Sequence, residues 1–175
     1  MSARHLQQPG PTRPDRVSTA TTARAQHVLA YLPAGQTLYE SLVTLFEAHG
    51  ARHGAFELLG GDLSTALYMT SVPNPGGLQV ATYGPRTVVG PAVLVRATGS
   101  YGPDLAGKPM MHMHGILAED WTDGRAHAGH LVPDSCVVGP RRVRALLTIG
   151  VGFAQIADAE TAFPLLFPVA AAPSP

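Results

Sequence analysis

The pattern of hydrophobic and polar residues changes from a helical to a strand-like period near residue 50. Between residues 37 and 50, apolar residues recur every three or four positions, which is typical of a helix with one buried face. Thr37 and Glu40 have the spacing of a capping box at its start, and Gly50 is a good C-terminal stop. The pattern therefore predicts one early helix. The positions on its shared face are Leu38, Leu42, Leu45, Phe46 and His49.

Most of the remaining chain predicts β-strands separated by turns rich in glycine and proline. The run 88–98 is interrupted at Gly90-Pro91, where we expect a bend or bulge, and residues 99–109 predict a loop. One early helix and many strands with short turns predict an α+β fold, with a mostly antiparallel β-sheet and one or two packed helices. The other expected strands are 25–32, 52–59, 64–69, 78–83, 110–118, 126–132, 143–149 and 153–156, followed by an apolar stretch over 163–169.

The two ends of the chain depart from this pattern. Residues 1–24 contain several prolines, threonines, serines and arginines, which predicts a disordered tail, and residues 170–175 predict a second one. The ordered domain is expected over residues 25–169. We find no segment apolar and long enough to cross a membrane and no secretory signal, so we expect a cytoplasmic protein. The single cysteine, Cys136, lies in an apolar stretch and is expected to be a buried, inert thiol.

Three histidines stand in one predicted β-hairpin. His112 and His114 belong to a Met-His-Met-His run, and side chains two apart on a strand point to the same face. A polar segment ending in Asp-Gly follows, which is a strong turn signal, so the next strand can run back antiparallel. If the turn centres near Trp121 and Thr122, His130 lies opposite His114 or one step away from it.

These three imidazoles predict a divalent metal site formed by His112, His114 and His130. Three neutral imidazoles with an empty fourth position match an open zinc site, and iron, nickel and copper also accept imidazole. We therefore expect a divalent metal, with zinc as the first choice. His127 should point to the opposite face of the hairpin because it lies three residues before His130, and we exclude it from the cluster.

A catalytic metal would need a general acid or base within reach. The candidates are Glu57, Asp62 and Glu119, and each is better explained as a solvated surface carboxylate. Glu119 has the opposite strand parity to His114, so it should point away from the site unless the strand bends. The sequence therefore leaves the catalytic residues unknown.

Composition bears on the partners of the protein. Only 14% of the residues are charged and 45% are hydrophobic, whereas about 25% charged residues is typical of soluble domains. We therefore expect part of the apolar surface to be buried between subunits. The formal net charge is zero, whereas nucleic-acid-binding proteins usually carry a basic surplus, so we do not expect a nucleic-acid partner. The basic run Arg141, Arg142 and Arg144 is better explained as an exposed strand edge.

Several motifs, taken in order, resemble a known family. Pro33-x-Gly35 stands before the helix, and Asp158-x-Glu160-Thr161 stands near the end. Together with the central block they resemble the plants-and-prokaryotes conserved domain, called the PPC or PCC domain, in its prokaryotic single-domain type. The central block is the specific part, and it consists of Gly107-Lys108-Pro109, His112-x-His114, Gly129-His130-Leu131 and Cys136-Val-Val138.

The resemblance implies a homotrimer built on a mostly antiparallel sheet, and it implies that the three histidines correspond to metal-binding positions of prokaryotic members. It implies no settled activity. Plant members carry AT-hook motifs beside the domain, but this chain has no Arg-Gly-Arg-Pro motif, so their DNA-binding role is not expected here. Residues 57–62 and 84–88 depart from the family pattern, so a substrate or partner can differ.

Three functional hypotheses remain open. The first is a trimeric metal-binding protein whose metal binds a small-molecule ligand or activates water. The second is a non-catalytic oligomeric adaptor or regulatory module, in which a metal only braces the hairpin and requires a fourth protein ligand. The third is a cupin-like metal-dependent enzyme, because His112-x-His114 followed by Glu119 copies part of the first cupin motif.

Overall fold

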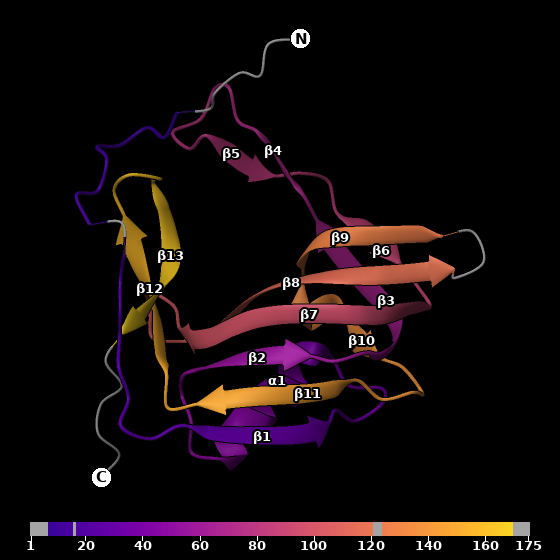
Figure 1. Cartoon of the computed structure of the whole chain (residues 1–175). Coiled ribbons are helices and arrows are strands. Elements are labelled where there is room, and N and C mark those ends of the chain that lie inside the picture. Colours follow the sequence, from indigo (N-terminus) through magenta and orange to yellow (C-terminus); the bar gives the residue numbers. More distant parts are fainter. Residues whose placement is uncertain (1–6, 16, 121–123, 170–175) are drawn as a thin grey trace.

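The computed structural model describes residues 7–15, 17–120 and 124–169. In this part of the chain, nine strands form one sheet in the order β1-β11-β2-β7-β8-β9-β3-β10, with β6 paired to β3 (Figure 1). All pairings between these strands are antiparallel, which confirms the predicted mostly antiparallel sheet. The strands are β1 (Gln26–Tyr31), β2 (Gly54–Leu58), β3 (Gly61–Met69), β6 (Thr87–Val89), β7 (Ala92–Pro103), β8 (Pro109–Asp120), β9 (Arg125–Leu131), β10 (Val137–Val138) and β11 (Arg144–Ile149).

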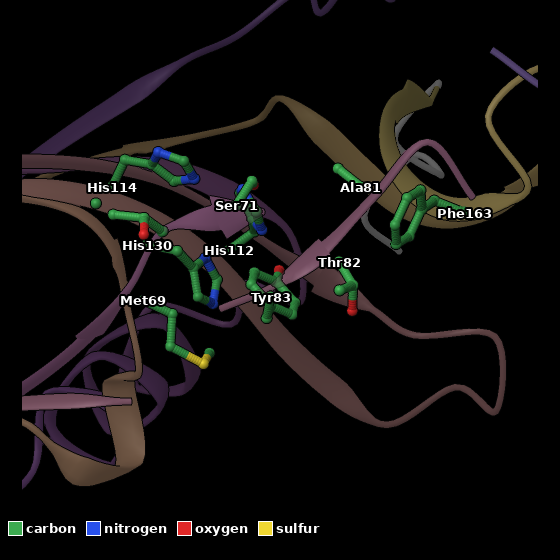
Figure 2. A pocket seen from close by; sticks show the side chains of 11 residues that line it. Met69, Ser71, Ala81, Thr82, Tyr83, His112, His114, His130 and Phe163 are labelled. Atoms are coloured by element: carbon green, nitrogen blue, oxygen red, sulfur yellow. The ribbon is translucent and has the colours of Figure 1, made fainter. Parts of the chain in front are cut away.

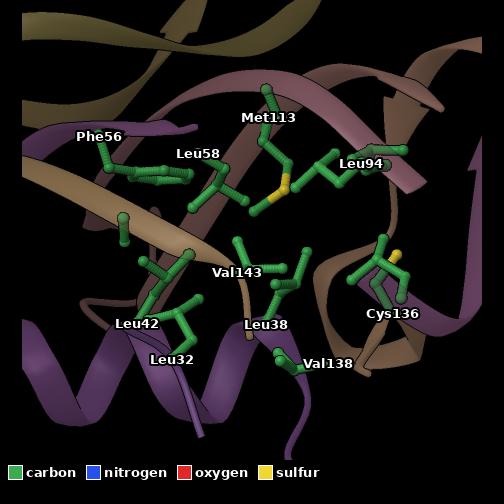
Figure 3. Packing of buried hydrophobic residues seen from close by; sticks show 14 of the residues in the cluster. Leu32, Leu38, Leu42, Phe56, Leu58, Leu94, Met113, Cys136, Val138 and Val143 are labelled. Atoms are coloured by element: carbon green, nitrogen blue, oxygen red, sulfur yellow. The ribbon is translucent and has the colours of Figure 1, made fainter. Parts of the chain in front are cut away.

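One α-helix, α1 (Leu38–Ala48), covers one face of this sheet in the described chain. The predicted capping box is confirmed: Thr37 Oγ1 accepts from the N–H of Glu40 at 3.1 Å, and Glu40 Oε2 accepts from the N–H of Thr37 at 3.0 Å. The apolar face of the helix packs against the sheet and forms the core (Figure 3). A short 3-10 turn, η1 (Pro133–Ser135), lies between β9 and β10. The fully buried side chains of the helix are Leu38, Leu42 and Phe46.

Two small hairpins stand outside the large sheet. The strands β4 (Ser71–Pro73) and β5 (Ala81–Tyr83) form the first, and β12 (Gly152–Asp158) and β13 (Phe163–Val169) form the second. The strand predicted over 78–83 is therefore shorter than expected. The side-chain amide of Gln79 donates to the carbonyl of Ala162 at 3.0 Å, so the two hairpins are joined at their turns.

The prediction of a loop over residues 99–109 is wrong for residues 99–103. The strand β7 continues to Pro103, and only the short connection 104–108 separates it from β8. A Cβ atom at Gly99 would collide with the ring of Phe56, and one at Gly102 would collide with the carbonyl of Phe153. These glycines allow close packing inside a strand. The glycine-rich sequence is typical of a turn, but the residues form part of β7. The predicted interruption at Gly90-Pro91 is confirmed, since it separates β6 from β7.

No helix of the described chain covers the face of the sheet opposite α1, although the β4–β5 hairpin lies over it at His130 and β12 lies against it at Gly102; we call this face the open face. Register pairs Leu29 with Leu146, Glu57, Thr98 and His114 in successive strands, so these side chains point to the same side. Large apolar side chains are exposed on this face. They are Leu29 at 60%, Tyr31 at 61% and Ile116 at 46% exposure.

Part of the predicted N-terminal tail lies against the β12–β13 hairpin. The N–H of Gly10 donates to the carbonyl of Glu160 at 2.9 Å, and the N–H of Arg13 donates to Glu160 Oε2 at 2.9 Å. The Arg13 guanidinium lies 3.5 Å from Asp158 and 4.5 Å from the ring centre of Phe167. Residues 1–6 and 170–175, which belong to the predicted tails, lie outside the described residues, and the boundaries at 25 and 169 stay predictions.

Cys136 is fully buried, as expected, and its Sγ lies 3.6 Å from the carbonyl oxygen of Leu67. The described helices include none that is both long and apolar enough to span a membrane.

Candidate metal site

The strands β8 and β9 bring the three predicted histidines together. His114 pairs directly with His130 in the antiparallel register, as the spacing predicted, and His112 lies two residues before His114 on the same face. The residues expected at the centre of the turn, Trp121 and Thr122, lie outside the described part of the chain. The local hairpin sequence is therefore sufficient to align the three imidazoles.

The three imidazole rings face a common space. Their ring centres are 5.0 Å apart for His112 and His114, 4.8 Å for His112 and His130, and 5.6 Å for His114 and His130. One ring nitrogen from each residue lies within 4.8 Å of the others. The nitrogens of a tetrahedral zinc site lie about 3.4 Å apart, since each Zn–N bond is about 2.1 Å. Small side-chain rotations are therefore enough to fit an ion between the rings.

Burial favours the neutral form of two of the three imidazoles, His112 and His130. Burial, followed by the charges of His112 and His114, lowers the pKa of His130 from 6.5 to about 4. Burial and His114 also lower the pKa of His112. Nδ1 of His130 is buried and has no hydrogen-bond partner among the described residues, which is costly for a polar atom. Neutral imidazole is the form that binds metal, so these residues fit a divalent ion.

His127 lies on the opposite face of the hairpin, as expected. Its Nδ1 is hydrogen bonded to the Tyr68 hydroxyl at 3.1 Å, and its Nε2 lies 3.3 Å from Glu119. It is therefore held by polar partners away from the cluster.

The three carboxylates considered as general acids or bases are all engaged elsewhere. Glu57 pairs with Arg96, Asp62 accepts from Arg141 Nε at 2.8 Å, and Glu119 lies beside His127 as described above. None of the three lines the cavity at the histidine cluster. Each of them is therefore better explained as a surface carboxylate than as a general acid or base.

A cavity of about 340 Å³ opens beside the imidazoles (Figure 2). Its other walls come from the β4–β5 hairpin and from Phe163 at the start of β13. The ring centre of Tyr83 lies 4.9 Å from that of His130, and burial raises the pKa of the Tyr83 hydroxyl, so this group stays protonated at neutral pH. The lining residues are Met69, Thr70, Ser71, Ala81, Thr82, Tyr83, His112, His114, Gly129, His130 and Phe163.

Our sequence prediction did not include Tyr83 or Phe163 in this site. Both belong to strands far from the histidine hairpin in the sequence, and their contribution depends on where the two small hairpins fold back. No local spacing pattern links an aromatic residue in one hairpin to an imidazole in another.

Several solved structures are similar to this fold. A candidate DNA-binding protein from Ralstonia eutropha JMP134 has 22% identity over 79% of this chain and 88% of its own, with a TM-score of 0.63. A metal-containing protein from Archaeoglobus fulgidus has 18% identity over 86% of this chain and 98% of its own, with a TM-score of 0.65. A plant- and prokaryote-conserved protein from Pyrococcus horikoshii has 16% identity over 85% and 96%, with a TM-score of 0.61. At these identities the similarity shows the fold alone.

No curated protein matches the chain in sequence. The model of the Plants and Prokaryotes Conserved (PCC) domain, however, matches residues 19–146, which include α1 and the whole histidine hairpin. The motifs that resembled this family lie largely inside the matched range. The chain therefore belongs to the PCC domain family.

Proposed function

We propose that this protein binds one divalent metal ion per chain through His112, His114 and His130, and that zinc is the preferred ion. The observation that carries the proposal is the convergence of three ring nitrogens within 4.8 Å of one another. The lowered pKa values of His112 and His130 support it, because both rings are neutral at physiological pH. The similar fold of the metal-containing Archaeoglobus fulgidus protein agrees with it.

The bound ion would hold a small-molecule ligand. The described residues supply three ligands to the ion and no fourth His, Cys, Asp or Glu close enough to complete a closed structural site. Zinc held by these three imidazoles would supply an electrophilic centre for such a ligand. Because the described lining contains no carboxylate to serve as a general base, ligand binding is better supported than catalysis.

We also propose that the protein assembles as a homotrimer, as the family resemblance implies. The open face supports assembly, because Leu29, Tyr31 and Ile116 are large apolar side chains left exposed on one chain. Since the histidines lie on the same face, assembly would bring a second chain close to the metal site.

Two alternatives fit less well. A cupin-like enzyme does not agree with the family match or with a helix packed on one face of the sheet. Nucleic-acid binding has little support, because the net charge is zero and Arg141 is paired with Asp62.

Metal analysis of the purified full chain tests the proposal. We expect one zinc ion per chain, and His112→Ala should weaken zinc binding by about 100-fold or more, since even residues that only orient a ligand cost up to that amount. His127→Ala is the matched control, because this residue lies on the same hairpin but faces away, and it should leave the zinc affinity unchanged. Equal zinc stoichiometry and affinity in His112→Ala and the native chain would overturn the proposal.

A further inference from the structure

We infer that the ligand of this site is a small organic carboxylate whose body is an apolar group about the size of a benzene ring. The carboxylate would bind the metal, and the ring would lie between the histidine cluster and Phe163. This inference rests on the proposed metal binding, and it adds the chemical class of the ligand.

The charge of the site favours an anion. A divalent ion on three neutral imidazoles carries two positive charges, and none of the described lining residues is an Asp or Glu that could offset them. An anionic oxygen donor therefore gains more from the ion than a neutral donor does. The described lining also contains no Lys or Arg, so the favourable position for negative charge is confined to the metal end of the cavity.

The far side of the cavity favours an apolar group. Figure 2 shows the imidazoles on one side and Phe163 and Ala81 on the other, with Tyr83 between them. Met69 adds a further apolar side chain beside the imidazoles, and the hydroxyl-bearing residues of the lining are Thr70, Ser71, Thr82 and Tyr83. The volume of about 340 Å³ is at the lower end of the range for ligand sites, which suits a small molecule with a single ring.

The two distant walls are held together before any ligand arrives. The hydrogen bond from Gln79 to Ala162 joins the β4–β5 connection to the residue just before Phe163. Asp158 accepts hydrogen bonds from the N–H of Thr161 at 2.9 Å and from its hydroxyl at 2.7 Å, which fixes the turn that leads to Phe163. A cavity braced in this way loses little conformational entropy when an apolar group enters it.

Calorimetric titration of the zinc-loaded full chain tests the ligand class with three probes. Phenylacetate carries both the carboxylate and the ring, acetate carries only the carboxylate, and phenylacetamide is the neutral relative of the first. We expect phenylacetate to bind about tenfold more tightly than acetate, because the ring is removed from water. Phenylacetamide should bind at least about tenfold more weakly than phenylacetate, because it lacks the charge.

A pair of variants tests the position of the ring. Phe163→Ala should weaken phenylacetate binding by about fivefold or more while leaving acetate and zinc affinity unchanged. Leu165→Ala is the control, since Leu165 lies on the same strand, is 38% exposed and does not line this cavity. This substitution should leave the affinities for phenylacetate, acetate and zinc unchanged.

The outcomes separate the two proposals. A chain that binds no zinc overturns the proposed function and this inference with it. A chain that binds zinc but shows equal affinity for phenylacetate and acetate, or for phenylacetate and phenylacetamide, overturns the ligand class and leaves metal binding standing. If Phe163→Ala does not fold, the probe series on the native chain still decides.

Discussion

His130 is the residue whose burial has the clearest consequence for the pH dependence of stability. Its pKa is lowered from 6.5 to about 4, mainly by burial, so in the metal-free protein the unfolded state binds the proton more readily than the folded state. The folded state should therefore lose stability as the pH falls from 6.5, with the loss complete below about pH 4.

Urea unfolding of the metal-free protein at pH 7.5 and pH 4.5 measures this effect. We expect the native chain to unfold at a lower urea concentration at the acidic pH. The variant His130→Gln has no titrating ring at this position, so it should show a smaller difference between the two conditions. An equal difference in both proteins would mean that the acid sensitivity arises at other groups.

The three histidines could be predicted because their arrangement depends on local rules. The side-chain alternation of a strand aligns His112 with His114, and the antiparallel pairing of β8 with β9 aligns His130 with His114. Tyr83 and Phe163 could not be predicted in the same way, because separate hairpins carry them to the site. A site formed within one hairpin can thus be predicted from a single sequence, whereas the walls of a cavity formed by separate hairpins cannot.

At the scale of elements, the start of α1 is the feature that local sequence determines most directly. Thr37→Ala removes the side-chain oxygen that accepts from the N–H of Glu40, and we expect it to lower the free energy of unfolding by about 1 kcal/mol. Thr44→Ala is the matched control, because Thr44 is exposed within the same helix. It should be neutral or stabilising by roughly 0.5 kcal/mol, since alanine has the higher helix propensity.

Urea denaturation of both variants gives the comparison. Equal destabilisation by the two substitutions would show that loss of a threonine side chain, and not loss of the cap, causes the effect.

The extent of the strands could be predicted less well than the helix. In β7, Gly99 and Gly102 permit contact with Phe56 and Phe153, which are distant in sequence. A glycine that serves a turn and a glycine that serves close packing look the same in a single sequence. The difference is decided by tertiary contacts, which explains why residues 99–103 were expected to be a loop.

The β12–β13 hairpin is stabilised by a segment from the other end of the chain. Arg13 contributes an ion pair to Asp158 and a cation–π contact to Phe167. We therefore expect Arg13→Ala to increase the hydrogen-exchange rate of the β12–β13 amides roughly threefold, because the ion pair and the cation–π contact each contribute little free energy.

The control for this experiment is Arg142→Ala. Arg142 lies in the β10–β11 connection, at the opposite end of the sheet from this hairpin (Figure 1). Its substitution should leave exchange in the hairpin unchanged. Exchange in Arg13→Ala equal to that of the native chain would show that the N-terminal segment does not stabilise the hairpin.

At the scale of the whole molecule, the open face and the metal site are parts of one surface. Leu29 on the edge strand β1 begins a row of paired residues that crosses neighbouring strands through Thr98 to His114 and His130. The helix covers only the other side of the sheet, and the β4–β5 hairpin covers the histidine end of this surface, so a single chain leaves the part around Leu29, Tyr31 and Ile116 exposed. The low content of charged residues agrees with a surface that is buried by a second copy.

The proposed homotrimer should therefore depend on Leu29. Sedimentation equilibrium of the native chain at micromolar concentration should give a mass of about 55 kDa, three times the 18.3 kDa of one chain. Leu29→Asp places a charge where the face would be buried, and the mass should fall toward 18.3 kDa. Leu78→Asp is the control, because Leu78 is 85% exposed in the β4–β5 connection, outside the open face. A monomeric native chain, or an unchanged mass in Leu29→Asp, would show that the open face is not the surface through which the chains assemble.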